Sequence, residues 1–188
     1  TILGSNMTKK MNGVSVDFLG WSAQPDGSGE VRYRGENLFS GYYNDDAATE
    51  AVLREGWLYT GDMAREDEDG FIYLVDRKKD VVISGGENLY PVQIEDFLRA
   101  YDKIKDVAVI GLPDKRLGEI TLAIIEVKPE ATLTEDEVNS FCLGMPKYKR
   151  PKKIIFADVP RNPTGKIEKP VLREKYCGVS LVEAQINS

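Results

Sequence analysis

The sequence contains no histidine, which excludes a large group of catalytic and metal sites. Without histidine, the chain cannot form a Ser-His-Asp triad, a Cys-His pair or a metal site with imidazole ligands. The two cysteines, Cys142 and Cys177, are too few for a disulfide framework or a four-cysteine zinc site. We therefore expect no metal ligands in this chain, and we interpret both cysteines as thiols in a reducing compartment, the cytoplasm.

Long apolar segments and targeting signals are also missing. The longest apolar run, at residues 122–127, is interrupted by Glu126 and is far shorter than the roughly 18 residues of a membrane span. No basic start followed by an apolar stretch and a cleavage site is visible, so we expect no signal peptide and no membrane span. With 188 residues, 41% of them hydrophobic and 30% charged, the composition indicates a globular protein of one or two domains.

Charge is distributed unevenly along the chain. The net charge is −6, yet residues 145–175 hold ten Lys or Arg against three acidic residues. This basic segment is either a solvated face or a patch that binds an anionic ligand. Because the rest of the chain is strongly acidic, we expect no nucleic-acid partner and favour a small phosphate-bearing molecule.

The first part of the chain has the pattern of a β-rich unit. Apolar and polar residues alternate over 14–18 and 30–34, with turn residues at 24–29 between them, which predicts a hairpin. Residues 45–54 have helical spacing, and 71–75 form a predicted strand after an acidic turn at 66–70. The charge cluster at 76–80 predicts a boundary, and we divide the chain into residues 1–78 and 79–188.

The second part mixes helices and strands, so the predicted class is α+β. Predicted helices cover residues 91–101, a stretch from Thr134 through Met145, and 169–176. Thr134 and Glu137 have the spacing of a capping box, which marks the start of the second helix. Strands are predicted near 81–83 and at 106–112, 120–127 and 153–157, and we expect a three-stranded sheet with helices.

Two short glycine motifs carry little information by themselves. Gly85-Gly86 follows a strand but lacks the G-x-G-x-x-G spacing of a dinucleotide loop. Residues 163–166, Pro-Thr-Gly-Lys, lack the first glycine and the final Ser or Thr of a Walker loop. Read alone, each motif indicates a turn.

Taken together, four stretches resemble the adenylate-forming superfamily, and within it the acyl-CoA synthetases. They lie at residues 41–49, 56–62, 76–91 and 160–169, in the order and spacing of that family. The resemblance implies that residues 1–78 are the barrel-like, β-rich end of a large N-terminal AMP-binding domain and that 79–188 are its mobile C-terminal domain. The phosphate loop of the family and its magnesium ligand are not among these residues. We therefore expect a C-terminal fragment that is inactive alone and that works with the rest of its own N-terminal domain.

The family chemistry implies a two-step ligase reaction. A carboxylate attacks ATP to give an acyl-adenylate, and the thiol of coenzyme A then displaces AMP. The motif style implies a fatty acid as the substrate, with Mg²⁺ expected in the parent enzyme. An aryl-CoA ligase or another carboxylate–CoA ligase is the alternative within this class. A non-catalytic ligand-binding or interaction module is the alternative from another class.

The resemblance also implies roles for three residues in adenylate formation. Lys166 matches the catalytic lysine that bridges the carboxylate and the α-phosphate. Asp62 matches the acceptor of hydrogen bonds from the ribose hydroxyls, since a carboxylate has two oxygens for two vicinal hydroxyls. Arg77 matches a second ribose or phosphate contact, for which an ion pair with Asp76 is the alternative explanation.

The remaining expected site residues belong to the second step. Lys79 falls at the position of the family hinge, about which the C-terminal domain turns between the two half-reactions. Gly85, Gly86 and Glu87 fall where the family binds the pantetheine arm of coenzyme A, and glycine there leaves room for a thin chain. Lys149, within the basic run 147–152, is a candidate contact for the phosphates of coenzyme A.

Overall fold

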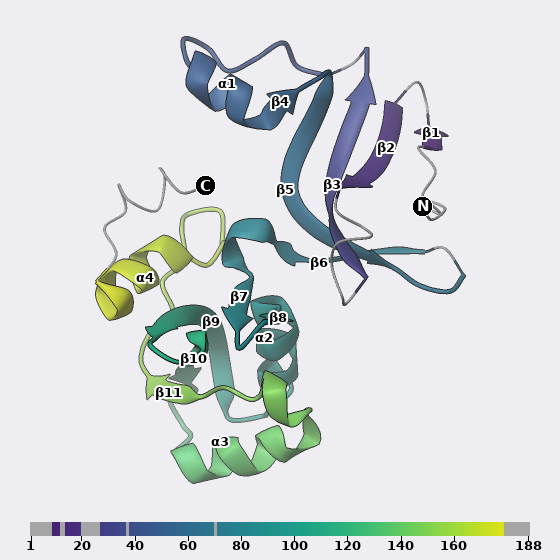
Figure 1. Cartoon of the computed structure of the whole chain (residues 1–188). Helices are drawn as coiled ribbons and strands as arrows, with labels where there is room; N and C mark the ends of the chain where they lie inside the picture. The colour runs from purple at the N-terminus through teal and green to yellow at the C-terminus, as the bar shows by residue number, and fades with distance from the viewer. Residues whose placement is uncertain (1–8, 12–13, 20–26, 37, 70, 179–188) are drawn as a thin grey trace. The chain divides into compact units, whose positions relative to one another are not determined.

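The computed structural model describes residues 9–11, 14–19, 27–36, 38–69 and 71–178 (Figure 1). Contacts between residues divide the chain into two compact units, 1–79 and 80–188. The division falls one residue after the boundary expected from the charge cluster at 76–80. Residues 24–26 of the turn expected at 24–29 lie outside the described residues. The two units are described separately below.

The first unit is built on one antiparallel sheet. Its strands are β1 (Lys9–Met11), β2 (Val14–Leu19), β3 (Ser28–Gly35), β4 (Leu53–Arg54), β5 (Trp57–Glu66) and β6 (Ile72–Arg77). The order is β1-β2-β3-β5-β4, and β6 pairs with the second half of β5. The predicted pairing of the two alternating segments is confirmed, with Val16 opposite Tyr33. None of the pairings between the described strands closes the sheet into a barrel.

The helix predicted at 45–54 is shorter than expected. Helix α1 (Asp46–Val52) begins after Asp45, whose side chain accepts a hydrogen bond from the Ala48 N–H at 2.9 Å. The next two residues form β4 instead, because Glu55 and Gly56 both have positive φ and turn the chain back onto β5. A two-residue turn of this kind matches the twist of a hairpin and ends the helix.

The second unit contains a five-stranded sheet, so the expectation of three strands is wrong. Its strands are β7 (Val82–Ser84), β8 (Glu87–Leu89), β9 (Ile104–Asp114), β10 (Gly118–Val127) and β11 (Lys153–Phe156). The order is β11-β10-β7-β8, with β9 paired along β10. One added strand, β7, pairs with β10 at Ser84 and Gly118. The other, β8, is present because Gly85 and Gly86 reverse the chain and allow residues 87–89 to pair with β7.

Three helices accompany this sheet: α2 (Pro91–Arg99), α3 (Glu135–Phe141) and α4 (Lys169–Cys177). The predicted capping box of Thr134 and Glu137 is confirmed. Helix α3 ends four residues before Met145, and the chain continues as a 3₁₀ turn at Cys142–Gly144. The physical reason is Pro146, which disfavours helical backbone at the residue before it; Met145 is accordingly extended, at φ −98° and ψ 153°.

The hydrophobic core of this unit lies on both faces of β9 and β10. One cluster joins the strands to α2 and α3, and it includes Ile94, Leu98 and Val138. The other cluster joins the opposite face to α4 through Leu172 and Ile110. Strands that are covered on both faces consist almost entirely of apolar residues, which explains the apolar run at 122–125. None of the described helices is long and apolar enough to cross a membrane.

Candidate functional site

Asp62 and Arg77 meet on neighbouring strands of the first unit. They are directly opposite each other in the pairing of β5 with β6. The Nη1 atom of Arg77 lies 3.2 Å from the Oδ1 atom of Asp62. The Arg77 side chain is 59% exposed and the Asp62 side chain 32%. The Arg77 side chain therefore pairs with Asp62, while only the backbone N–H of Arg77 donates to Asp76. A carboxylate and a guanidinium thus share one open position on this sheet.

A buried carboxylate, Glu30, holds the turn that precedes Asp62. Glu30 is 7% exposed and accepts hydrogen bonds from the Gly61 N–H at 3.1 Å and from Lys78 at 2.9 Å. The Thr60 hydroxyl donates to the Val31 carbonyl at 2.8 Å and accepts from the Asp62 N–H at 3.0 Å. Sequence reasoning did not single out Glu30, because its function depends on a partner 31 residues away.

Lys79 lies in a 3₁₀ turn, Lys78–Asp80, and it is the last residue of the first unit. Its two neighbours are held by different units. Lys78 forms an ion pair with Glu30 of the first unit at 2.9 Å, and Asp80 forms one with Arg173 of the second unit at 2.6 Å. Lys79 therefore lies between two residues, Lys78 and Asp80, that are each held by an ion pair within a different unit.

The turn between β7 and β8 contains Gly85, Gly86 and Glu87. Both glycines have positive φ, 59° and 86°, a conformation that other residues adopt only at a cost. The Gly85 N–H donates to the Leu117 carbonyl at 2.8 Å, and a Cβ on Gly85 would lie 3.2 Å from a Leu117 methyl carbon. A Cβ on Gly86 would meet no atom within 4 Å, so the space beside this residue is open.

Lys166 lies near the end of a short loop between Pro160 and Glu168. The loop is closed by an Arg161–Ile167 bridge and by a hydrogen bond from the Asn162 N–H to the Lys166 carbonyl at 2.9 Å. The Lys166 side chain is exposed, and within the described part of the chain its ammonium has no hydrogen-bond or ion-pair partner. The backbone is thus ordered while the charged group faces outward.

Two carboxylates of the sheet contact the segment that leads into this loop. The Asp106 carboxylate receives two hydrogen bonds from Arg161, at 2.6 and 3.0 Å, and Glu126 accepts from the Val159 N–H at 3.1 Å. Burial opposes ionisation of Asp106, but the hydrogen bonds from Arg161 and the Val107 N–H outweigh it and lower the pKa of this carboxyl. The hydrogen bond from Lys105 lowers the pKa of Glu126.

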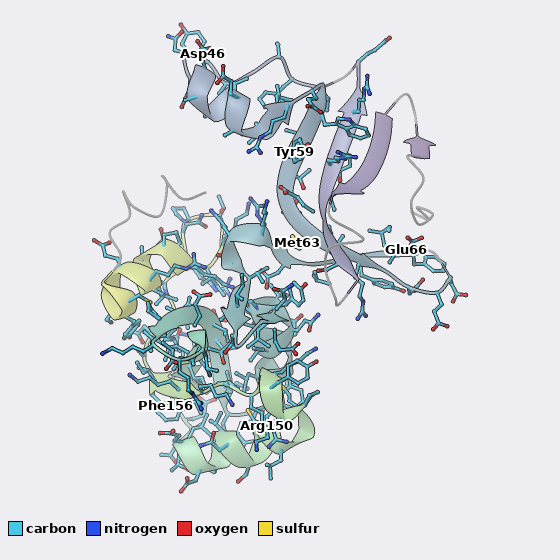
Figure 2. The ribbon with its side chains drawn as sticks, in the orientation of Figure 1. Asp46, Tyr59, Met63, Glu66, Arg150 and Phe156 are labelled. Carbon is cyan, nitrogen blue, oxygen red and sulfur yellow. The ribbon has the colours of Figure 1, made fainter. Side chains whose placement is uncertain are left out.

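The basic segment is less positive in the folded chain than in the sequence. Arg161, Lys169 and Arg173 form ion pairs with carboxylates outside the segment. Lys149 donates to the Gln93 side chain at 2.9 Å. Arg150, which is labelled in Figure 2, donates to the backbone carbonyls of Leu143 and Met145, in and just after the 3₁₀ turn that follows α3. A large part of this segment therefore stabilises the fold.

The structure brings together only some of the predicted site residues. Asp62 and Arg77 form one pair, and Gly85 to Glu87 form one turn. No hydrogen bond or ion pair among the described residues joins that turn to Lys149 or Lys166. Among the described residues, no group of three Cys, Asp or Glu could hold a metal ion.

Comparison with known proteins places this geometry in a family. Residues 93–166 match the model of the AMP-binding enzyme C-terminal domain. A long-chain-fatty-acid–CoA ligase of Mycobacterium tuberculosis, FadD13, is 45% identical over 152 residues, which are 80% of this chain and 30% of that protein. The chain thus spans about 30% of the length of this curated relative.

Solved structures agree with the sequence matches. ATP-bound MatB from Rhodopseudomonas palustris has a TM-score of 0.77 and 37% identity, covering 88% of this chain and 34% of that one. The o-succinylbenzoate CoA synthetase MenE of Bacillus subtilis, in complex with its acyl-adenylate intermediate, has a TM-score of 0.75 and 30% identity, with coverage of 88% and 34%. Residues 93–166 belong to the AMP-binding enzyme C-terminal domain family, and most of the chain is similar in sequence and structure to CoA ligases of the adenylate-forming type.

Proposed function

We propose that this chain is the C-terminal part of an acyl-CoA synthetase that activates a carboxylic acid, a fatty acid in the first instance, with ATP and transfers it to coenzyme A. The observation that carries this proposal is Lys166. It lies in the matched family segment, on an ordered loop, with an exposed ammonium. The similarity to CoA ligases supports the reaction class, and the 45% identity to a fatty-acid ligase is consistent with a fatty acid as the substrate.

In the first half-reaction, we assign Lys166 to the reacting phosphate. The carboxylate oxygen attacks the α-phosphorus of ATP, the bond to the bridging oxygen breaks, and pyrophosphate leaves. All reacting groups are anionic, so a positioned ammonium stabilises the transition state more than the separated reactants. Lysine suits this role because it is a compact point charge that can contact two oxyanions at once.

Asp62 and Arg77 are proposed to bind the nucleotide. Their side chains are partly exposed, and they are held by the pairing of β5 with β6 and by Glu30 beneath the turn. When a ribose is present, the Asp62 oxygens accept hydrogen bonds from its two hydroxyls. Arg77 pairs with Asp62 and remains available to a ribose or phosphate oxygen.

Lys79 is proposed as the hinge between the two half-reactions. Its neighbours on either side are tied by ion pairs to different units, so rotation concentrates at the residue between them. Hinges are a few positions that absorb a large change in backbone angles while the packed bodies remain rigid. Such a rotation would let one domain present Lys166 in the first step and another surface in the second.

The second surface is proposed to be the turn of Gly85, Gly86 and Glu87, with Lys149 as a contact for the phosphates of coenzyme A. The open space beside Gly86 supports passage of a thin thiol-bearing arm. The thiol attacks the acyl carbonyl carbon, and AMP leaves with the electron pair of the mixed anhydride.

Two cysteines without a disulfide are consistent with a cytoplasmic location.

The decisive experiment separates the two half-reactions in the full-length enzyme. Lys166→Ala should reduce adenylation by about 10²–10³-fold, by analogy with removal of an oxyanion-hole donor. Thioester formation from supplied acyl-adenylate should be largely unchanged. Lys175→Ala, which removes an exposed lysine of α4 in the same unit, is the control and should affect neither step.

A panel of fatty, aryl and dicarboxylic acids in the same assay identifies the substrate class. Highest kcat/KM for a fatty acid supports the proposed substrate, and a preference for an aryl acid corrects it. Equal losses in both half-reactions for Lys166→Ala, or a loss under about tenfold, would contradict the catalytic assignment. Absence of any carboxylate-dependent adenylation in the full-length protein would favour a non-catalytic binding module.

A further inference from the structure

The loop that contains Lys166 is held at three places by carboxylates from other elements. Glu126 of β10 accepts from the Val159 N–H just before the loop, and Asp106 of β9 binds Arg161 inside it. Just after the loop, the Lys169 ammonium lies 2.9 Å from Glu95 of α2. The sequence separations run from 33 to 74 residues, so no local preference of the loop explains these contacts.

Two of these carboxylates are direct cross-strand neighbours, because Asp106 and Glu126 face each other in the pairing of β9 with β10. Like charges at such a position are destabilising when both remain unpaired. Here cations offset both charges: Arg161 binds Asp106, Arg99 lies 3.7 Å from the same carboxylate, and Lys105 binds Glu126. The two acids are therefore compatible with the fold because cations surround them, and one of those cations, Arg161, comes from the loop.

Arg161 connects the sheet to the peptide unit that precedes Lys166. Its Nε and Nη2 bind both oxygens of Asp106, a fork geometry that fixes the orientation of the guanidinium. Its third nitrogen, Nη1, donates to the carbonyl oxygen of Gly165. On the other side of the same peptide unit, the Lys166 N–H donates to the Asn162 side chain at 2.9 Å. Both polar groups of the Gly165–Lys166 peptide are thus held.

Without these contacts, the peptide before Lys166 would have unusual freedom. Gly165 has φ +83°, and a Cβ at this position would meet no atom within 4 Å, so no neighbouring atom restricts the backbone angles of Gly165. Thr164 and Pro163 beside it are exposed. The direction in which Lys166 leaves the backbone therefore depends on hydrogen bonds. The Arg161 and Asn162 side chains hold the Gly165–Lys166 peptide, and two backbone hydrogen bonds, from the Gly165 N–H to the Asn162 carbonyl at 2.8 Å and from the Asn162 N–H to the Lys166 carbonyl at 2.9 Å, close the loop around it.

We propose that Arg161, oriented by Asp106, is a positioning residue that sets the direction of Lys166 for the adenylation step. This role rests on the proposed function of Lys166. Arg161 acts through the backbone of the loop, so it contacts neither ATP nor the carboxylate. An arginine is required rather than a lysine, because three nitrogens must reach three acceptors at the same time.

If Arg161 only stabilised the fold, its loss would weaken the loop and the sheet equally. The Arg161 side chain is 41% exposed, and Asp106 still has Arg99 at 3.7 Å when Arg161 is replaced, so the carboxylate of the sheet is not left without a cation. Loss of Arg161 should therefore loosen the loop while the sheet beneath it stays intact. A displacement of about 1 Å at a catalytic group can reduce a rate by about 10²-fold, so a local change suffices to affect catalysis.

The first test uses half-reactions of the full-length enzyme. Arg161→Gln should lower adenylation by roughly 10–100-fold and leave thioester formation from supplied acyl-adenylate unchanged. Arg161→Lys should recover only part of the loss. In a Lys166→Ala background, Arg161→Gln should produce no further loss, because its effect passes through Lys166. Lys103→Gln, which removes the remote ion pair with Glu137, is the matched control and should change neither step.

The second test requires no enzymatic activity. In the 188-residue chain, amide hydrogen exchange of residues 162–166 should rise at least tenfold in Arg161→Gln and in Asp106→Asn, while residues 107–110 of β9 keep their protection. Unchanged exchange in the loop, or equal acceleration in the loop and in β9, would overturn the proposal. So would an additional loss in the Lys166→Ala background. If Lys166→Ala leaves adenylation intact, the proposed function of Lys166 is wrong. The positioning role of Arg161 in catalysis is then overturned as well, even if the exchange experiment shows that Arg161 holds the loop.

Discussion

Replacement of Lys169 by methionine should unfold the second unit more readily without affecting the first. Lys169 begins α4, and its ammonium forms an ion pair with Glu95 at 2.9 Å. The two side chains are 10% and 4% exposed, so the pair is buried. Removal of one partner from a buried ion pair costs about 3–5 kcal/mol, because the other charge is left without compensation in a poorly solvated place.

The structure decides where within this range each variant falls. After Lys169→Met, Glu95 still accepts from the Val109 N–H at 2.8 Å and lies 3.5 Å from Arg99, so we expect the lower value, about 3 kcal/mol. After Glu95→Met, the ammonium loses its partner and the Val109 N–H loses its acceptor, so we expect about 5 kcal/mol. The double variant should cost less than the sum of the two, since it leaves no isolated charge.

The assay uses the uneven distribution of tryptophan. Both tryptophans, Trp21 and Trp57, lie in residues 1–79, so their fluorescence reports on the first unit. Native-state hydrogen exchange of β9 and β10 reports on the second unit, and exchange should accelerate roughly 10²-fold in Lys169→Met and 10³–10⁴-fold in Glu95→Met. The unfolding transition measured by tryptophan fluorescence should not move.

The control Lys175→Met removes an exposed lysine from the same helix and should change the free energy of unfolding by less than about 0.5 kcal/mol. If Lys169→Met behaves like this control, the assignment of stability to the buried pair is wrong.

Three further predictions concern the turn, the hinge and acid stability. Gly86→Leu should retain adenylation and lose transfer to coenzyme A, whereas Gly178→Leu, with a similarly positive φ at the end of α4, should retain both steps in the same half-reaction assays. Lys79→Pro should impair one half-reaction far more than the other, because a fixed φ and a missing N–H restrict rotation; equal losses would argue against a pivot there. The hydrogen bond from Lys103 lowers the pKa of Glu137 from 4.5 to about 2, with the capping threonine contributing. A lowered pKa stabilises the fold above the unfolded-state value and ceases to do so as the pH falls through the folded-state value. The stability difference between the wild type and Glu137→Gln should therefore be constant above about pH 5 and disappear towards pH 2, as measured by urea unfolding at each pH.

Local patterns in the sequence predicted most of the helices and strands. The Thr134–Glu137 capping box, the apolar spacing of 91–101 and the β-branched strands at 106–112 and 120–127 all correspond to elements of the structure. These features depend on neighbours a few residues apart, and the responsible forces act over the same distance. The α+β class followed from the same patterns, and the family was expected from the resemblance of four stretches of the sequence to adenylate-forming enzymes.

Local patterns failed where the chain reverses or where a distant partner decides. The helix predicted at 45–54 ends at Val52 because Glu55 and Gly56 form a tight turn, and the residues before it pair with β5. The sheet of the second unit has five strands rather than three because β7 joins β10 at Ser84 and Gly118, and β8 pairs with β7 across the Gly85–Gly86 turn. Helix propensity and apolar spacing cannot report on a hydrogen-bonded neighbour that arrives later in the chain.

The sequence by itself determined the chemical types available to this protein: no imidazole, a lysine after Thr164-Gly165, and a glycine turn before α2. Only the tertiary structure decided which charges are free to act. Arg161 and Lys169 look equivalent to Lys166 in the basic segment, yet they bind Asp106 and Glu95, while the Lys166 ammonium faces outward. The physical reason is that a charge is neutralised by whichever opposite charge lies within a few ångströms, and folding brings these carboxylates there from 55 and 74 residues away.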